Sequence, residues 1–309
     1  MRLSIALPLL SLAFHGSAAL ADLPNKTQLS AYAEQMLADA YPADGPGAAV
    51  LIARGDEVIY RGARGLASVE LKVPLSTDHA FRIGSVTKQF AAAGLLKLID
   101  AGKVSLDDRL TKFLPNFPNG ANITVRQLLD HTSGVKSYTG IPGVMDGPIR
   151  QDLSTTALVA TFQDKPVDFA PGAGWAYNNS GYVLVGAVIE AASGKAWHAH
   201  LTESILAPAG LQHTVYGADD VLISGMARGY SVRNGAVVPA AYLSMTQPHA
   251  AGALVSTVDD LFRWNRALHG GKVLQADAYT AMTTPAGKAL EANYGFGIAR
   301  GTLRGHTQL

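Results

Sequence analysis

Cysteine is absent from all 309 residues of the chain. Disulfide bonds, thiolate metal sites and cysteine nucleophiles are therefore excluded, and a fold in an oxidising compartment has to be stable without cross-links. An excess of one sign of charge is also absent, because the chain has 25 basic and 24 acidic residues. This balance provides no attraction to nucleic acid or to an anionic membrane surface, and we expect neither as a partner.

Hydrophobic runs long enough to span a bilayer are missing too, although the N-terminus is apolar. Arg2 precedes an apolar run over residues 3–14, and small residues lead to the sequence Ala19-Leu20-Ala21. This is the plan of a secretory signal peptide, and the run is too short for a membrane-spanning helix. We expect cleavage after Ala21, no integral membrane segment, and a mature protein that is periplasmic or secreted.

Residues 22–309 contain enough apolar side chains for a large core, since hydrophobic types make up 48% of the sequence. No internal repeat, low-complexity tract or linker-like stretch divides them. The sequence therefore predicts a single domain after the signal peptide.

Periodicity predicts a helix and a hairpin first. Residues 26–40 space their apolar side chains at helical intervals, which indicates an amphipathic helix. Two apolar segments, 47–54 and 57–61, then flank Gly55 and Asp56, the pattern of a β-hairpin.

The middle of the chain is predicted to be helical. A helix over residues 85–101 would end at Gly102, a typical C′ residue. Thr124 with Gln127 three residues later forms a capping-box pattern at the start of another helix. Further helices are predicted over residues 154–163, 180–193, 197–207 and 257–269.

The end of the chain, residues 293–300 and 301–306, has the pattern of two strands with a turn between them. Strands at both ends with helices between them predict a mixed α/β (α+β) fold. We expect residues 22–105 and 250–309 to form a sheet part, and residues 106–249 to form an inserted helical part.

One lysine, Lys88, stands in an apolar helical segment three residues after Ser85. It is the only charged residue between Ile83 and Leu96, and a charged amine is costly to bury without compensation. Residues three apart on a helix share a face, so the amine would reach Ser85. The helix N-terminus favours developing negative charge, and burial would lower the pKa of the lysine until it can accept the serine proton.

Ser-x-x-Lys is a weak pattern alone, and the chain contains a second copy at Ser133 and Lys136. There the serine follows a predicted helix, so we interpret it as a turn residue, with His131 near the negative end of the helix dipole. For Ser85 and Lys88 the alternative is a helix N-cap and a lysine that extends its amine to solvent.

Five motifs follow one another along the chain, and their order is more specific than any one of them. They are Ser85-x-x-Lys88, Leu128-Leu-Asp-His-Thr-Ser-Gly-Val, Tyr177-x-Asn179, Ala251-Gly-Ala-Leu-Val-Ser-Thr-Val-Asp-Asp-Leu and Gly305-His306-Thr307. This order resembles the class C β-lactamase-like serine hydrolases, which include AmpC-type β-lactamases, DD-carboxypeptidases, D-aminopeptidases and esterases. The resemblance covers nearly all of residues 22–309.

The resemblance implies a β-lactamase/DD-peptidase-like fold, with an antiparallel sheet flanked by helices and an inserted helical subdomain. It also implies that Ser85 is the acylated nucleophile and Lys88 its base. Tyr177 would relay the proton, its phenol pKa lowered by nearby cationic charge. Asn179 would bind Lys88 and the substrate amide. Alternatively, Tyr177 is a loop tyrosine and Asn179 a helix N-cap. No metal or organic cofactor is implied.

The third motif of that family lies on the edge strand beside the nucleophile, where His306 and Thr307 would bind substrate. Here Gln308 stands where the family has glycine, and a side chain there would obstruct substrate along the strand. The family's next strand and C-terminal helix do not follow Leu309, so we expect a C-terminally truncated chain that exposes the sheet face and part of helix 26–40. The alternative is a natural short variant.

The sequence thus predicts an exported serine hydrolase acting on amide or ester bonds of D-Ala-type peptides, β-lactams or esters, with a small molecule or peptidoglycan peptide as substrate. The histidine of the third motif favours peptidase or esterase activity over a dedicated β-lactamase. The alternative is a catalytically impaired remnant or a binding module with the same fold. His198 and His200 point to different helix faces, which argues against a shared metal. Asp259 and Asp260 fall in the first turn of a helix, where they complement its dipole.

Overall fold

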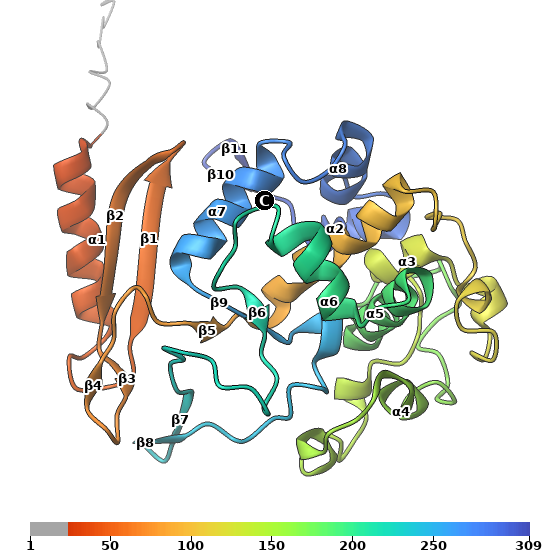
Figure 1. The fold of residues 1–309 in the computed structure, drawn as a ribbon, viewed down its shortest axis with the longest axis horizontal. Coiled ribbons are helices and arrows are strands. Elements are labelled where there is room, and N and C mark those ends of the chain that lie inside the picture. The colour runs from red at the N-terminus through yellow and green to blue at the C-terminus, as the bar shows by residue number, and fades with distance from the viewer. Residues whose placement is uncertain (1–23) are drawn as a thin grey trace, which may run out of the picture.

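The N-terminal part of the protein is a helix packed on a two-stranded hairpin. A computed structural model describes residues 24–309, and the predicted signal peptide lies outside these residues. Helix α1 (Lys26–Ala40) lies along strands β1 (Ala48–Arg54) and β2 (Glu57–Arg64), as Figure 1 shows in red and orange. Asn25 caps the helix with a capping box to Gln28. The predicted helix and hairpin are therefore confirmed.

The remaining elements are mostly helices with short strands between them. The other helices are α2 (Thr87–Asp100), α3 (Val125–Leu129), α4 (Thr155–Ala160), α5 (Asn179–Ser193), α6 (Trp197–Leu201), α7 (Val258–His269) and α8 (Ala276–Thr283). The other strands are β3 (Leu66–Ser68), β4 (Val73–Pro74), β5 (Phe81–Arg82), β6 (Val215–Tyr216), β7 (Tyr230–Arg233), β8 (Ala236–Pro239), β9 (Leu254–Ser256), β10 (Gly301–Leu303) and β11 (His306–Gln308). Each predicted helix is confirmed, whereas α8 and most short strands were not predicted.

Helix α2 lies at the centre of the large part of the molecule and packs against α5. Both helices are buried over nearly their whole length, with Phe90 and Tyr182 fully inside the main hydrophobic core. A helix that is apolar all round is stable only when other elements cover every face. The position of α2, including its first turn, is therefore fixed by the elements that pack around it.

Strand β9 connects this start to the rest of the fold. It is the middle strand of the sheet β5-β9-β6, and both of its pairings are antiparallel. The backbone N–H of Leu254 donates to Oγ1 of Thr87 over 3.1 Å, and the N–H of Ile83 donates to the carbonyl of Leu254 over 3.0 Å. These bonds hold β9 beside the chain on both sides of Ser85.

The prediction of a strand over residues 293–300 is wrong. Gly297 has φ +74, and a Cβ there would lie 2.7 Å from the carbonyl of Lys88. Asn293 also has a left-handed backbone, with φ +50. An extended strand is incompatible with these angles, so the segment forms a compact loop against α2.

The two C-terminal strands pair with each other alone within residues 24–309. β10 and β11 form an antiparallel hairpin around Arg304 and Gly305, and every residue of both strands is exposed. β1 likewise pairs only with β2 in the described chain. The expected single sheet from both ends of the chain is therefore replaced by separate small antiparallel sheets.

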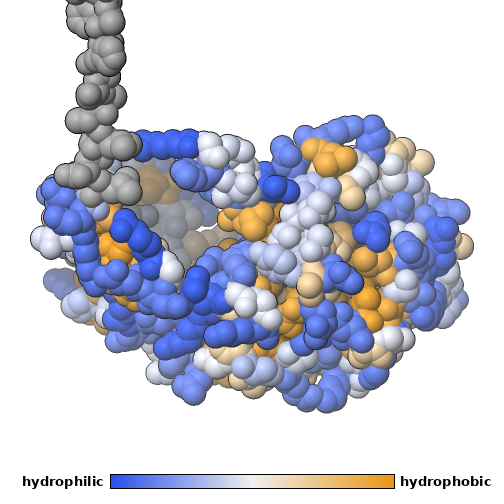
Figure 2. Space-filling model, turned by 90° about the horizontal axis from the view of Figure 1, so that it is seen from above, coloured by the Kyte–Doolittle hydropathy of each residue, from blue (hydrophilic) through white to orange (hydrophobic). Residues whose placement is uncertain are grey.

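A groove lies between β1 and α7, with a volume of about 520 Å³. Val50 and Leu51 line it from the strand, and Leu261 and Phe262 line it from the helix. Figure 2 shows the hollow between the N-terminal unit and the rest of the molecule. On α1, Tyr32 and Met36 are exposed. Across residues 24–309, no helix is at once long and apolar enough to traverse a lipid bilayer.

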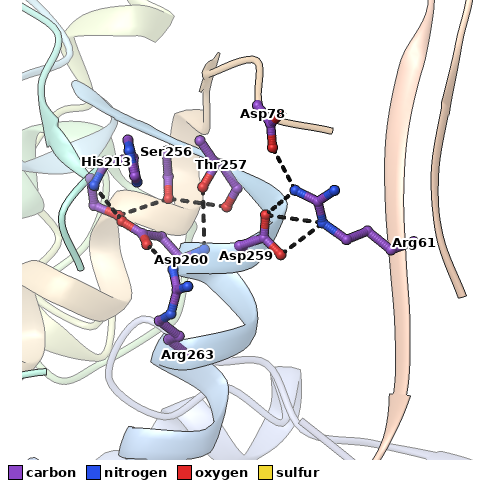
Figure 3. A network of polar contacts seen from close by, with 9 residues as sticks. Arg61, Asp78, His213, Ser256, Thr257, Asp259, Asp260 and Arg263 are labelled. Carbon is purple, nitrogen blue, oxygen red and sulfur yellow. Dashed lines mark hydrogen bonds and ion pairs between the residues drawn. The ribbon is translucent and has the colours of Figure 1, made fainter. Parts of the chain in front are cut away.

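Arg61 of β2 links the N-terminal unit to the rest of the fold (Figure 3). Its guanidinium donates to both carboxylate oxygens of Asp259 over 3.0 and 2.7 Å, and to Asp78 over 2.6 Å. Asp259 lies in the first turn of α7, as predicted, and the hydrogen bond from Arg61 lowers its pKa. The neighbouring Asp260 is fully buried and accepts bonds from Thr214 and Arg263.

We predict that Asp259→Asn lowers the free energy of unfolding by about 1 kcal/mol, because it removes a two-bonded ion pair and a helix-dipole contact. Asp78→Asn should have a smaller effect, since the side chain of Asp78 is 81% exposed and that of Asp259 only 27%.

Because the pKa of Asp259 is lowered on folding, its contribution to the free energy of unfolding is present above the unfolded pKa and is lost as the pH falls through the folded pKa. In urea denaturation, the difference between wild type and Asp259→Asn should shrink below about pH 4. A constant difference across that range would contradict the assignment.

Candidate active site

Ser85 lies on a short turn that leads into α2. Residues Gly84–Val86 form one turn of 3-10 helix, with Gly84 at φ +51. Such a left-handed backbone favours glycine, and it turns the chain from β5 into the helix. The side chain of Ser85 is exposed and makes no capping bond to the backbone. Its Oγ lies instead 3.1 Å from Nζ of Lys88.

Lys88 is buried completely, one helical turn after the serine. Besides Oγ of Ser85, its Nζ contacts two acceptors, Oδ1 of Asn179 at 2.9 Å and the carbonyl of Ala251 at 2.8 Å. The alternative in which Ser85 caps the helix and Lys88 extends to solvent is therefore contradicted. Three helical or turn segments, from α2, α5 and the stretch before β9, meet at one amine.

The three partners of Lys88 are compatible with both forms of the amine. Protonated –NH₃⁺ has three donors, one for each of Ser85 Oγ, Asn179 Oδ1 and the Ala251 carbonyl, whereas neutral –NH₂ has two donors and one lone pair. In the neutral form, two donors on Asn179 and Ala251 leave the lone pair for the hydroxyl proton of Ser85. The amide of Asn179 is oriented by a bond from its Nδ2 to Oγ1 of Thr139, over 3.1 Å.

Burial lowers the pKa of Lys88 from 10.5 to about 7. The cause is desolvation, because a charged amine loses its hydration in the protein interior and no carboxylate compensates it. A general base with a pKa near the working pH combines a populated free-base form with useful basicity. The site therefore contains a serine hydroxyl in contact with an amine that is partly unprotonated at neutral pH.

Tyr177 completes the group around the serine. Its ring centroid lies 4.7 Å from Nζ of Lys88. The expectation that cationic charge lowers the pKa of this phenol is wrong: desolvation raises the pKa, and the influence of the nearby Ser85 side chain only partly opposes that effect. Tyr177 is consequently a neutral phenol at physiological pH.

Asn179 is the first residue of α5, but the helix cap is its neighbour Asn178. Oδ1 of Asn178 accepts the N–H of Gly181 over 2.9 Å. The alternative that Asn179 serves as the N-cap is therefore contradicted, and its side chain is directed to Lys88 instead. Sequence reasoning did not assign a role to Thr139 or to the Ala251 carbonyl, because a backbone oxygen carries no residue-type signal.

The second Ser-x-x-Lys pattern has a different structure. Ser133 is buried, and its Oγ accepts the N–H of Val135 over 3.4 Å, as a turn residue does. Lys136 forms an ion pair with Asp168 over 2.7 Å. The interpretation of Ser133 as a turn residue is confirmed. His131, which was expected to be near a helix dipole, is buried, and desolvation lowers its pKa to about 3.

His306 and Thr307 lie on the exposed strand β11. Within residues 24–309 this strand is paired with β10 alone and not with β9, the strand that pairs with β5 just before Ser85. The structure thus brings together Ser85, Lys88, Tyr177 and Asn179, and it leaves His306 and Thr307 on a separate hairpin.

A hydroxyl nucleophile held by a buried amine defines a class of serine-dependent acyl-transfer site. The family comparison agrees with this class, because residues 35–307 match the family model described as Beta-lactamase. The protein belongs to the Beta-lactamase family, and its solved relatives share the expected β-lactamase/DD-peptidase fold.

Three relatives show the range of the similarity. A D-stereospecific amidohydrolase from Streptomyces sp. is 32% identical, with a TM-score of 0.76 over 89% of this chain and 84% of that one. Penicillin-binding protein 4* of Bacillus subtilis (strain 168) is 31% identical over 80% of this chain and 58% of its own length. Esterase EstB of Burkholderia gladioli is 35% identical over 54% of this chain and 46% of its own length. The chain thus spans roughly half of these two curated relatives, at 58% and 46%.

We predict that covalent labelling of Ser85 by a fluorophosphonate rises with pH through a midpoint of about 7, as Lys88 loses its proton. The sign follows from the lowered pKa, since only the free amine has a lone pair for the serine proton. The labelling rate should be measured from pH 5 to pH 9 on wild type and on Lys88→Met.

Lys88→Met keeps an unbranched side chain in the buried position, so the fold should be retained. Its labelling should be slower by about a thousandfold and should lack the limb near neutral pH. A wild-type profile that is flat from pH 5 to pH 9 would contradict Lys88 as the base.

Proposed function

We propose that the protein is a serine hydrolase that cleaves amide or ester bonds through an acyl-enzyme at Ser85. The observation that carries the proposal is the contact between the exposed Ser85 hydroxyl and the fully buried, desolvated amine of Lys88. Such a pairing lowers the free energy needed to form an alkoxide at the serine. A lysine with a purely structural role does not require contact with an exposed serine hydroxyl.

In the first half of the reaction, Oγ of Ser85 attacks the carbonyl carbon of the substrate while its proton passes to Nζ of Lys88. The new oxyanion would be stabilised by the amide N–H of Ser85, at the turn that begins α2, where the helix dipole favours negative charge. Collapse of the tetrahedral intermediate breaks the bond to the leaving group, which has to take up a proton.

Tyr177 is the group suited to deliver that proton. Its raised pKa keeps the phenol protonated, so it acts as a donor and not as the initial base. In this scheme the proton that Lys88 took from Ser85 restores the phenol before deacylation. In the second half a water molecule attacks the acyl carbon and Lys88 accepts its proton. Collapse of the second tetrahedral intermediate breaks the bond between the acyl carbon and Oγ of Ser85, Lys88 returns the proton to Oγ, and the carboxylic acid product leaves. Asn179 holds Lys88 and would also contact the substrate amide.

The substrate class is proposed from the relatives. One of them is a D-stereospecific amidohydrolase, and others are an esterase and penicillin-binding proteins. We infer that this chain acts on small amides or esters, with peptides ending in D-amino acids as the first candidates and β-lactams as acylating analogues. His306 and Thr307, on strand β11, would bind substrate. Export through the signal peptide at residues 1–21 is part of the same proposal.

We predict that a fluorescent penicillin or a fluorophosphonate labels the protein once and that Ser85→Ala abolishes the label. Hydrolysis of a p-nitrophenyl ester should fall by about 10⁴-fold or more in the same variant, because no other group replaces the nucleophile. Mass spectrometry of the labelled protein should place the adduct on the peptide that contains Ser85.

Ser133→Ala is the matched control, since it alters the second Ser-x-x-Lys pattern, and it should retain full labelling. Absence of any label on a folded wild-type sample would instead favour the alternative, a non-catalytic binding module with the same fold. The observation that keeps this alternative in view is that β11, which carries His306, pairs only with β10 among the described residues.

A further inference from the structure

His131 is a buried histidine in an unusual backbone conformation next to the proposed active site. It is 1% exposed and follows α3 with φ +65, in the left-handed region. A residue other than glycine adopts this region only when surrounding contacts hold it there. The mechanism above makes no use of this residue.

Two hydrogen bonds connect His131 to the loop that carries Tyr177. The N–H of Ala176 donates to the carbonyl of His131, and the N–H of Asn178 donates to its ring atom Nδ1, each over 3.2 Å. The residues on either side of Tyr177 are therefore both bonded to one histidine. The ring of His131 also packs on the ring of Tyr177, with centroids 4.6 Å apart.

The bond to Nδ1 fixes the state of the imidazole. An acceptor nitrogen carries no proton, so the hydrogen of the neutral ring is on Nε2. Among the described residues Nε2 has no hydrogen-bond partner, and the ring is surrounded by Tyr182, Tyr294 and Trp175. Desolvation and the nearby charge of Lys88 both lower the pKa of His131, to about 3, so it accepts this bond at every physiological pH.

We propose that His131 is a positioning residue for catalysis: it fixes the loop on both sides of Tyr177, and so sets Tyr177 and Asn179 against Ser85 and Lys88. The inference rests on the proposed function and deepens it. In the left-handed conformation the carbonyl and the ring of one residue reach the same loop. His131 itself has no contact with the reacting atoms and acts through Tyr177 and the start of α5.

Loss of the two hydrogen bonds between His131 and the Tyr177 loop should change the pKa of Lys88 as well as the labelling rate of Ser85. Tyr177 and Tyr182 both lie over the amine, at 4.7 and 5.5 Å from their ring centroids. The other titratable groups near His131 are Tyr294 and the buried Asp130. If the Tyr177 loop moves away, water reaches the amine, its desolvation falls, and the labelling midpoint moves to higher pH.

The test compares His131→Asn with His131→Leu. Asparagine keeps an acceptor near the position of Nδ1 and tolerates a left-handed backbone, whereas leucine provides neither property. The rate of fluorophosphonate labelling at Ser85 is measured from pH 5 to pH 10 for both variants and for wild type. His131→Leu should label about tenfold to a hundredfold more slowly, with a midpoint above that of wild type, because small displacements of catalytic groups have effects of this size. His131→Asn should recover most of the rate and the wild-type midpoint.

Leu37→Ala serves as the control for stability alone. Leu37 is buried in the small core under α1, far along the chain from the site, and its truncation lowers stability without touching Tyr177. It should leave the midpoint unchanged even where it lowers the folded fraction, which is monitored by circular dichroism.

If wild type is labelled and folded His131→Leu shows the same rate and midpoint, the role of His131 is refuted while the proposed function stands. If wild type itself is not labelled, the proposed function fails first. If His131→Leu does not fold, His131→Gly takes its place, since glycine lacks the ring acceptor but adopts the left-handed backbone without strain, and a wild-type rate and midpoint in that folded variant likewise refute the role.

Discussion

The burial of one amine is the constraint on which the site depends. Lys88 is fully inside the protein, and an ammonium group there would lose its hydration without a carboxylate to replace it. The fold resolves this cost by shifting the amine toward its neutral form. Its Nζ lies within hydrogen-bond distance of Asn179, the Ala251 carbonyl and Ser85, so that in the neutral form the lone pair is available to the serine. The pKa of Lys88 is thus set by the residues that pack around its amine.

The surrounding architecture keeps water from that amine. Helices α2 and α5 pack against each other in the main core, and the segment before β9 covers the start of α2. On another side the loop at Gly297 lies so close to the backbone of Lys88 that only glycine fits. Tyr177 forms the outermost layer, and it is 43% exposed, which leaves Ser85 accessible to a substrate. The amine of Lys88 is therefore shielded from water, whereas the hydroxyl of Ser85 is accessible to a substrate. This is the arrangement that acyl transfer requires.

Sequence reasoning predicted most helices and the core of the site, because both depend on local signals. Helix periodicity, the capping box at Thr124, and the isolated charge of Lys88 are all visible along a short stretch of chain. What could not be predicted depends on long-range packing. The carbonyl of Ala251 has no residue-type signature, the raised pKa of Tyr177 follows from burial by distant segments, and the loop at 293–300 is shaped by its contact with Lys88. The pairing of β10 with β11 alone was likewise hidden from the sequence.

The most direct test of this account is an NMR titration of Lys88 itself. Protein labelled with ¹³C at lysine Cε would be titrated from pH 5 to pH 11, and the Lys88 resonance would be assigned by its loss in Lys88→Arg. The account predicts one lysine signal with a midpoint of about 7, separated from all the others. A Lys88 midpoint of about 10, the value of an ordinary exposed lysine, would contradict a neutral amine as the base for Ser85.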